Sequence, residues 1–205
     1  MKRSGYLVVL FVLLGGIGYF TLQSQQASDL DNETQANEGV ALKSHGKQTD
    51  PEPKIGITKA DRKVSVDILN EVLANEFVLL LQTLNYHWNL VGPQFNDYHK
   101  LFNDQYTMIF GFTDTVAERI RVVGGIAIAS MSELVKISSL KEDTGDIPEP
   151  TEMVKNLLKQ HEALIVVLRQ GIDATTKDMG TNNFLTDLIE KHEKMAWMLR
   201  SLTAH

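Results

Sequence analysis

Apolar residues recur at three- and four-residue intervals over four long stretches of the chain, which is the spacing of a helix stripe that faces a core. These stretches cover residues 64–84, 95–123, 151–177 and 182–202. A weaker pattern predicts a short helix over residues 131–138. No segment alternates as a strand does, so the pattern predicts an all-α domain.

Strong breaks separate the predicted helices. Gly92-Pro93 follows the first helix, Gly124-Gly125 ends the second, and Thr181 is a candidate N-cap of the last. The connection between the second and third long helices is long and contains the short helix. A four-helix bundle with one crossover needs such a connection, so residues 58–205 are expected to form a ferritin-like bundle with a short extra helix in the crossover.

The N-terminus has a different pattern. Lys2 and Arg3 precede an apolar run over residues 6–22, which is typical of an export signal or a membrane anchor. We favour an uncleaved anchor at residues 1–22 over a removed signal, because the cleavage motif is weak. The basic start places the rest of the chain outside the cytoplasm. Residues 23–57 are polar and predict a flexible spacer.

Charge and cysteine content exclude several classes of protein. The formal net charge is -6, so a DNA partner is not expected, because phosphate binding needs an excess of Lys and Arg. The chain has no cysteine, which excludes disulfides, thiolate metal sites and cysteine nucleophiles.

Potential metal ligands surround the first break. His87 and His99 flank Gly92-Pro93, so an antiparallel hairpin would bring them to similar heights on neighbouring helices. Asp114 and Glu118 lie four residues apart on one helix face. His99 and Asp114 would lie about 22 Å apart along one helix. All four residues can therefore share a metal only if two histidines of one subunit meet two carboxylates of another.

Simpler interpretations of these residues remain open. A histidine at a helix end is commonly a packing or surface residue, and Asp114 and Glu118 beside Arg119 could form a solvated ion-pair face. If they are ligands, two imidazoles with two carboxylates suit iron better than magnesium or calcium, and zinc and manganese stay possible.

The residues around these ligands resemble the signature of the Dps family of mini-ferritins over residues 64–203. The matching stretches are Tyr86-His87-Trp88-Asn89, Gly92-Pro93-x-Phe95, His99-x-x-Phe102, Asp114-x-x-x-Glu118-Arg119-Ile120, Gly180-Thr181, Phe184-Leu185-Thr186-Asp187 and His192-Glu193-Lys194-Met195-Ala196-Trp197-Met198-Leu199-Arg200-Ser201. The resemblance implies a homo-oligomer, a hollow shell of twelve subunits, with ferroxidase centres at two-fold interfaces.

The resemblance also implies an activity. His87 and His99 would bind iron with Asp114 and Glu118 of a partner, and the protein would oxidise Fe(II) with hydrogen peroxide. Ferric iron would be stored in the shell, which protects against oxidative stress. Trp88 would be an aromatic residue near the site that intercepts stray oxidant, or a packing residue.

Two departures from the family pattern affect the expected sites. Asn103 stands where the family often has an acid, which weakens the second iron position. The family lines its iron-entry pores with acids, and Asp178 and Asp187 match these positions while Asn183 is neutral. Asp178 and Asp187 could instead cap helices.

Other functions fit the sequence less well. A shell that sequesters metal or displays a surface without turnover is the main alternative, and Asn103 favours it. A di-iron site inside one bundle needs Glu-x-x-His motifs, which the chain lacks.

Overall fold

Five helices make up most of the described part of the chain. The chain divides into two units, residues 1–48 and 49–205, and this computed structural model describes residues 51–203 of the second. The helices are α1 (Lys59–Asn89), α2 (Phe95–Val122), α3 (Met131–Ile137), α4 (Pro150–Ala174) and α5 (Met179–Thr203). Within residues 51–203 no strand occurs, and the all-α prediction is confirmed.

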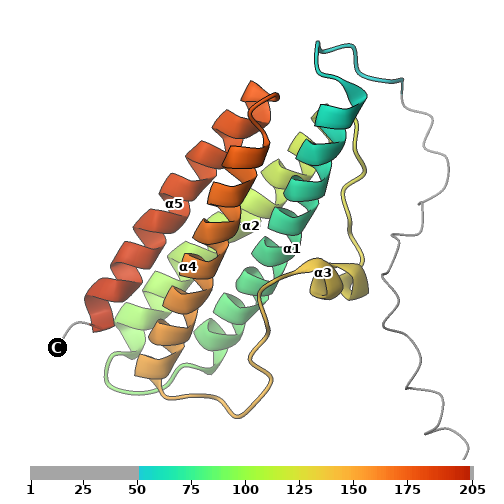
Figure 1. Cartoon of the computed structure of the whole chain (residues 1–205). Coiled ribbons are helices and arrows are strands. Elements are labelled where there is room, and N and C mark those ends of the chain that lie inside the picture. Colours follow the sequence, from blue (N-terminus) through green and yellow to red (C-terminus); the bar gives the residue numbers. More distant parts are fainter. Residues whose placement is uncertain (1–50, 204–205) are drawn as a thin grey trace, which may run out of the picture. The chain divides into compact units, whose positions relative to one another are not determined.

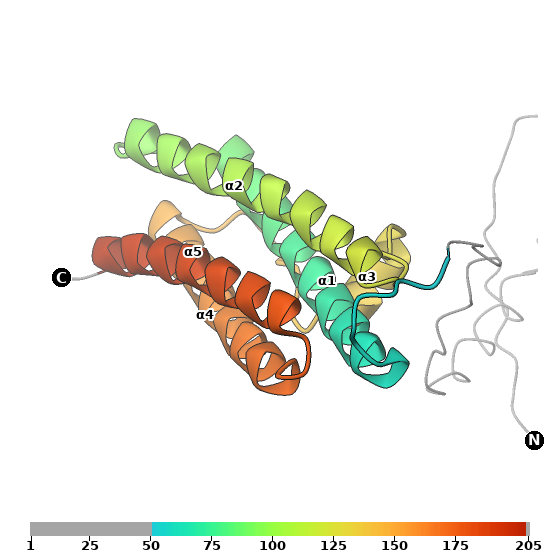
Figure 2. The same ribbon diagram turned by 90° about the horizontal axis from the view of Figure 1, so that it is seen from above.

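The four long helices form a bundle of two antiparallel pairs, α1 with α2 and α4 with α5 (Figures 1 and 2). The crossover from α2 to α4 runs back along the bundle, so α2 and α4 point the same way (Figure 1). The short helix α3 lies in this crossover and packs against α1. The ferritin-like topology with an extra crossover helix is therefore confirmed.

The helix α1 is buried around most of its circumference, because α2, α3 and α4 all pack against it. Its fully buried leucines Leu69, Leu73 and Leu79 lie in the same core as Leu164 of α4 and Leu185 of α5. A core shared by every long helix fixes the relative heights of side chains on different helices.

The predicted starts of α1 and α5 were wrong by a few residues. The helix α1 begins at Lys59 because the Thr58 hydroxyl caps it and accepts a hydrogen bond from the Asp61 amide at 3.1 Å. The helix α5 begins at Met179, and its cap is Asp178 rather than Thr181. The Asp178 carboxylate accepts a hydrogen bond from the Thr181 amide at 3.0 Å.

Two glycines with positive φ shape the ends of α2. Gly92 has φ 122° in the turn that precedes α2, and Gly124 has φ 84° where α2 ends. The Gly125 amide then donates to the Ile120 carbonyl at 2.8 Å, which closes the last turn. Side chains other than glycine rarely adopt such φ values, so these positions fix where the chain reverses.

Residues 51–57, which we predicted as the end of a flexible spacer, contact α1. Arg62 donates a hydrogen bond to the Ile57 carbonyl at 2.8 Å and forms an ion pair with Glu52. The predicted signal or anchor at residues 1–22 and the rest of the spacer lie outside the described residues. Among residues 51–203, no helix is both long and apolar enough to cross a bilayer.

Candidate metal centre

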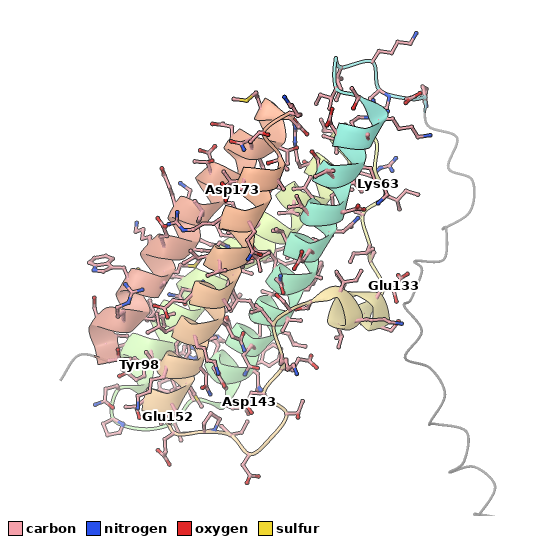
Figure 3. The ribbon with its side chains drawn as sticks, in the orientation of Figure 1. Lys63, Tyr98, Glu133, Asp143, Glu152 and Asp173 are labelled. Atoms are coloured by element: carbon pink, nitrogen blue, oxygen red, sulfur yellow. The ribbon has the colours of Figure 1, made fainter. Side chains whose placement is uncertain are left out.

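His87 and His99 meet at the end of the bundle where α1 turns into α2. His87 lies in the last turn of α1 and His99 in the second turn of α2. Their rings stack with centroids 3.8 Å apart and planes 19° apart. Figure 3 shows Tyr98, the neighbour of His99, at this end of the bundle and Lys63 at the other. The predicted meeting of the two histidines across the hairpin is therefore confirmed.

Each of these imidazoles is hydrogen-bonded to the backbone of the other residue. His87 Nδ1 lies 3.0 Å from the His99 carbonyl oxygen, and His99 Nδ1 lies 3.1 Å from the His87 carbonyl oxygen. A carbonyl oxygen can only accept, so both Nδ1 atoms carry a proton and donate. In the neutral ring each Nε2 then keeps a lone pair, which is the form that binds a metal.

Burial favours the neutral form of His87, whose side chain is almost fully covered. Its pKa is lowered mainly by desolvation, further by the neighbouring His99, and raised in part by the hydrogen bond to the His99 carbonyl. A lowered pKa keeps the His87 lone pair available at neutral pH, where a protonated imidazole could not bind a metal.

Two aromatic side chains of α2 contact the imidazole pair. The ring of Phe95 stacks on His99 at 4.7 Å between centroids. The ring of Tyr106 contacts the ring of His87 in an edge-to-face arrangement, with centroids 5.1 Å apart and planes 65° apart. The Tyr106 hydroxyl donates a hydrogen bond of 2.9 Å to Asn103 Oδ1. The amide oxygen of Asn103 is thus already an acceptor before any metal binds.

Asp114 and Glu118 lie further along α2, away from the imidazole pair. Both side chains are exposed, and neither has a hydrogen-bond or ion-pair partner in the part of the chain described here. Phe110, four residues before Asp114 on the same helix, is 66% exposed. Val122, four residues after Glu118, is 56% exposed. Apolar residues around exposed carboxylates are typical of a surface that another molecule covers.

The four predicted ligands do not converge within one chain. Among residues 51–203 no group of three or more His, Asp or Glu side chains is arranged to hold a metal ion. The structure brings together His87 and His99 only. The assignment of all four residues to one centre stays a prediction that requires a second subunit.

The three predicted pore residues have different surroundings. Asp178 is 1% exposed, accepts hydrogen bonds from Ser65 and Thr181, and pairs with Arg119 at 3.0 Å. Burial opposes ionisation of Asp178, but these hydrogen bonds and Arg119 outweigh it and lower its pKa. Asn183 and Asp187 are exposed on α5. The geometry of Asp178 fits the capping interpretation, and a pore role for all three stays a prediction.

Trp88 is not one of the aromatic residues that contact the two histidines. It is 65% exposed, and in residues 51–203 no ring contact links it to either histidine. Its exposure argues against a packing role inside this chain.

A line of buried polar groups crosses the middle of the bundle. His161 Nδ1 lies 3.0 Å from His192 Nδ1, and His192 Nε2 lies 2.8 Å from Glu76 Oε1. All three side chains are fully buried. His192 stands between the other two and uses both ring nitrogens, so the three do not converge on one point. The three residues therefore form a row of hydrogen-bonded side chains with His192 as its middle member.

Tyr106 is a neighbour of the centre that was not among the residues predicted from the sequence. Tyr106 follows His99 by seven residues, which is close to two helical turns, so both lie on nearly the same face of α2. That spacing is a signal from which Tyr106 could have been found. Helical side chains lean toward the N-terminus, which brings the Tyr106 hydroxyl back to Asn103.

Comparison with known proteins defines the class to which this fold and centre belong. The family model of the ferritin-like domain matches residues 66–205, so the protein is a member of the ferritin-like superfamily. A low temperature-induced protein of Nostoc sp. is 44% identical over 74% of this chain and 86% of its own length. DNA protection during starvation protein 2 of Bacillus anthracis is 35% identical over 68% of this chain and 96% of its own length.

Solved structures agree with these relatives. The Dps protein from Bacillus brevis is 31% identical, has a TM-score of 0.69, and the match covers 72% of this chain and all of that one. The Dps protein from Vibrio cholerae is 29% identical, has a TM-score of 0.71, and the match covers 74% of this chain and 96% of that one. The chain belongs to the Dps family.

Proposed function

We propose that this protein oxidises Fe(II) with hydrogen peroxide at centres shared between two subunits and stores the ferric product in a shell of twelve subunits. The observation that carries the proposal is the reciprocal hydrogen bonding of His87 and His99. It leaves the Nε2 atom of each neutral ring with a lone pair that can bind a metal. The Vibrio cholerae relative is described as a member of a superfamily of ferritin-like diiron-carboxylate proteins.

The carboxylates of Asp114 and Glu118 supply the other half of the proposed centre. They are exposed and unpartnered in residues 51–203, and the apolar residues beside them suit a subunit interface. When the partner subunit covers this face of α2, its carboxylates would meet the imidazole pair. Two imidazoles with two carboxylates form a mixed nitrogen and oxygen set that suits Fe(II).

In this proposal the protein residues bind and orient the substrate iron. The imidazoles are fixed by backbone hydrogen bonds before iron arrives, so little ordering is needed on binding. Two Fe(II) ions give up one electron each, and hydrogen peroxide takes both with two protons to become two molecules of water. Paired electron transfer releases no hydroxyl radical, which would protect against oxidative stress.

The export and membrane tether that residues 1–22 predict form part of the proposal, and rest on the sequence pattern alone. The acidic balance of the chain supports the expectation that DNA is not a partner. Iron is the metal that the donor set favours, and the oxidising cosubstrate is hydrogen peroxide.

The test is anaerobic oxidation of Fe(II) by added hydrogen peroxide, with the full-length protein beside its His87→Ala and Asp114→Ala variants. We expect rapid oxidation that both substitutions abolish. Asp97→Ala, which removes another exposed carboxylate of α2, is the matched control and should keep the parent rate. If the parent oxidises iron no faster than buffer, the enzyme proposal fails.

Such a failure would favour the second candidate function, a metal-sequestering shell without turnover. The observation that favours this candidate is Asn103, whose neutral amide oxygen is already bound by the Tyr106 hydroxyl. Retention of iron without oxidation would identify it.

A further inference from the structure

The proposed centre has fewer anionic ligands for one iron ion than for the other. The inference below rests on the proposed function. The position one turn after His99 holds Asn103, a neutral amide whose oxygen accepts a hydrogen bond from Tyr106 at 2.9 Å. The carboxylate of the next residue, Asp104, is exposed and pairs with Lys100 at 2.7 Å. Neither residue offers a free anionic ligand, so one iron position is much weaker than the other.

A centre that holds one Fe(II) at a time supplies one electron at a time. Hydrogen peroxide that receives a single electron splits into hydroxide and hydroxyl radical, whereas two electrons convert it to water or hydroxide only. Reduction of peroxide at such a centre without release of hydroxyl radical therefore needs a second one-electron donor beside the iron.

Tyr106 is placed to be this donor. Its ring meets the His87 ring at 5.1 Å, and its half-buried phenol is bonded to Asn103 at the weak iron position. A phenol is an oxidisable side chain that can lose an electron and a proton together. The hydrogen bond to Asn103 holds the hydroxyl on the side of α2 that faces the imidazole pair.

Other aromatic residues are placed less well. Trp88 is 65% exposed and has no ring contact with the two histidines among residues 51–203. Tyr98 is buried and stacks on Phe102 at 6.2 Å. Tyr86 is bound to Asp143 and Asn156, and its pKa is raised to about 12, mainly by burial.

We infer that Tyr106 supplies one electron to hydrogen peroxide and so allows two-electron reduction at a centre that holds a single iron. Fe(II), the Tyr106 phenol and H2O2 give Fe(III), the Tyr106 phenoxyl radical, OH⁻ and H2O. The O–O bond breaks as one electron comes from iron and one from the phenol. The phenolic proton ends in the water molecule, so no hydroxyl radical leaves.

The next Fe(II) restores the tyrosine. This second ion gives one electron to the phenoxyl radical, which takes up one proton from water, and a second Fe(III) results. The two steps together consume two Fe(II) for each peroxide, the ratio of a centre with two equal positions. Tyr106 thus stores one oxidising equivalent between the arrivals of two iron ions.

The test is freeze-quenched electron paramagnetic resonance of the full-length protein, loaded anaerobically with less than one Fe(II) per subunit and mixed with hydrogen peroxide. We expect a tyrosyl radical signal that is lost in Tyr106→Phe and kept in Tyr98→Phe, a tyrosine of the same helix. A spin trap should also detect several-fold more hydroxyl radical from Tyr106→Phe than from the parent.

Two contrary outcomes are distinguishable. A radical signal of the same size and shape in Tyr106→Phe would overturn the inference alone, and its loss in Trp88→Phe would identify Trp88 as the donor. No oxidation of iron by peroxide in the parent would overturn the proposed function and the inference with it.

Discussion

His161 and His192 face each other across the core of the bundle, with their Nδ1 atoms 3.0 Å apart. His192 is bonded on its other side to Glu76, and all three side chains are fully buried. Burial lowers the pKa of His161 well below its ordinary value, and the neighbouring His192 lowers it further. His161 is therefore neutral in the folded protein under conditions in which the unfolded chain binds a proton.

This difference predicts a loss of stability in acid. Between the unfolded pKa of about 6.5 and the lower folded pKa, the unfolded chain holds one more proton, so stability falls as the pH falls. The expected slope is about 1.4 kcal/mol for each pH unit in that range. Chemical denaturation at fixed protein concentration, measured from pH 8 to pH 5, checks it.

The matched variant is His161→Gln, whose amide can still bond to His192 but does not titrate. We expect a smaller dependence of the unfolding free energy on pH below about 6.5 in this variant. An unchanged slope would show that another group causes the acid sensitivity.

The proposed inter-subunit centre predicts complementation between two inactive variants. A pair of one His87→Ala and one Asp114→Ala subunit contains one centre with both defects and one centre with neither. Co-assembly of equal amounts, by joint refolding, should restore about a quarter of the parent rate of peroxide-driven oxidation if subunits pair at random. Simple mixing of the two preformed assemblies is the control and should stay inactive. Equal inactivity of both preparations would contradict a shared centre.

The amide at position 103 predicts a gain of metal affinity in Asn103→Asp. The carboxylate can keep the hydrogen bond from Tyr106 and adds a negative charge beside the imidazole pair. Two unit charges 4 Å apart attract by about 4 kcal/mol at an effective dielectric of 20, and desolvation offsets part of this. We expect at least about tenfold tighter binding of a second Co(II) per centre in titration calorimetry. Asp104→Asn is the control and should not change the second affinity.

The buried environment of Asp178 predicts a structural effect of its removal. Asp178→Ala removes the cap of α5 and leaves Arg119 without its carboxylate, so we expect a loss of about 2–4 kcal/mol in unfolding free energy. Asp178→Asn keeps a capping oxygen and should cost less. Denaturation of both variants under the same conditions measures the difference.

The exposure of Asp187 predicts that its removal affects iron uptake rather than stability. Asp187→Asn should leave stability within about 0.5 kcal/mol of the parent. If Asp187 lines an iron-entry pore, the substitution should slow iron uptake, because it removes a charge that attracts cations. Uptake that is unchanged in Asp187→Asn and slowed in Asp178→Asn would support Asp178 as the pore residue.

The sequence predicted the elements that follow from apolar spacing and missed those that follow from polar contacts. The bundle and the hairpin that joins His87 to His99 were predicted because both depend on helix periodicity and on one break. The first turn of α1 was missed because its residues are mostly polar, although Thr58 is a recognisable cap. The reciprocal hydrogen bonds of the two histidines depend on backbone geometry that no pattern of residue types records.

The polar line in the core shows another limit of sequence reasoning. Glu76, His161 and His192 come from three helices, and their pairing depends on relative heights that only the packed core fixes. Glu76 follows Leu73 by three residues and so lies on an apolar face, which is an unusual place for a carboxylate. That feature marks one buried residue but does not name its partners.

The two imidazoles form half of the proposed centre inside a single folded chain, and the carboxylates can arrive only with another subunit. An ion that needs both halves would bind the assembled pair more tightly than the separate subunits. By thermodynamic linkage, that ion must also drive association. Dilution would then release iron from the centre, and scarce iron would favour separated subunits. The concentration of Fe(II) would thereby regulate the fraction of subunits that are paired and carry a complete centre.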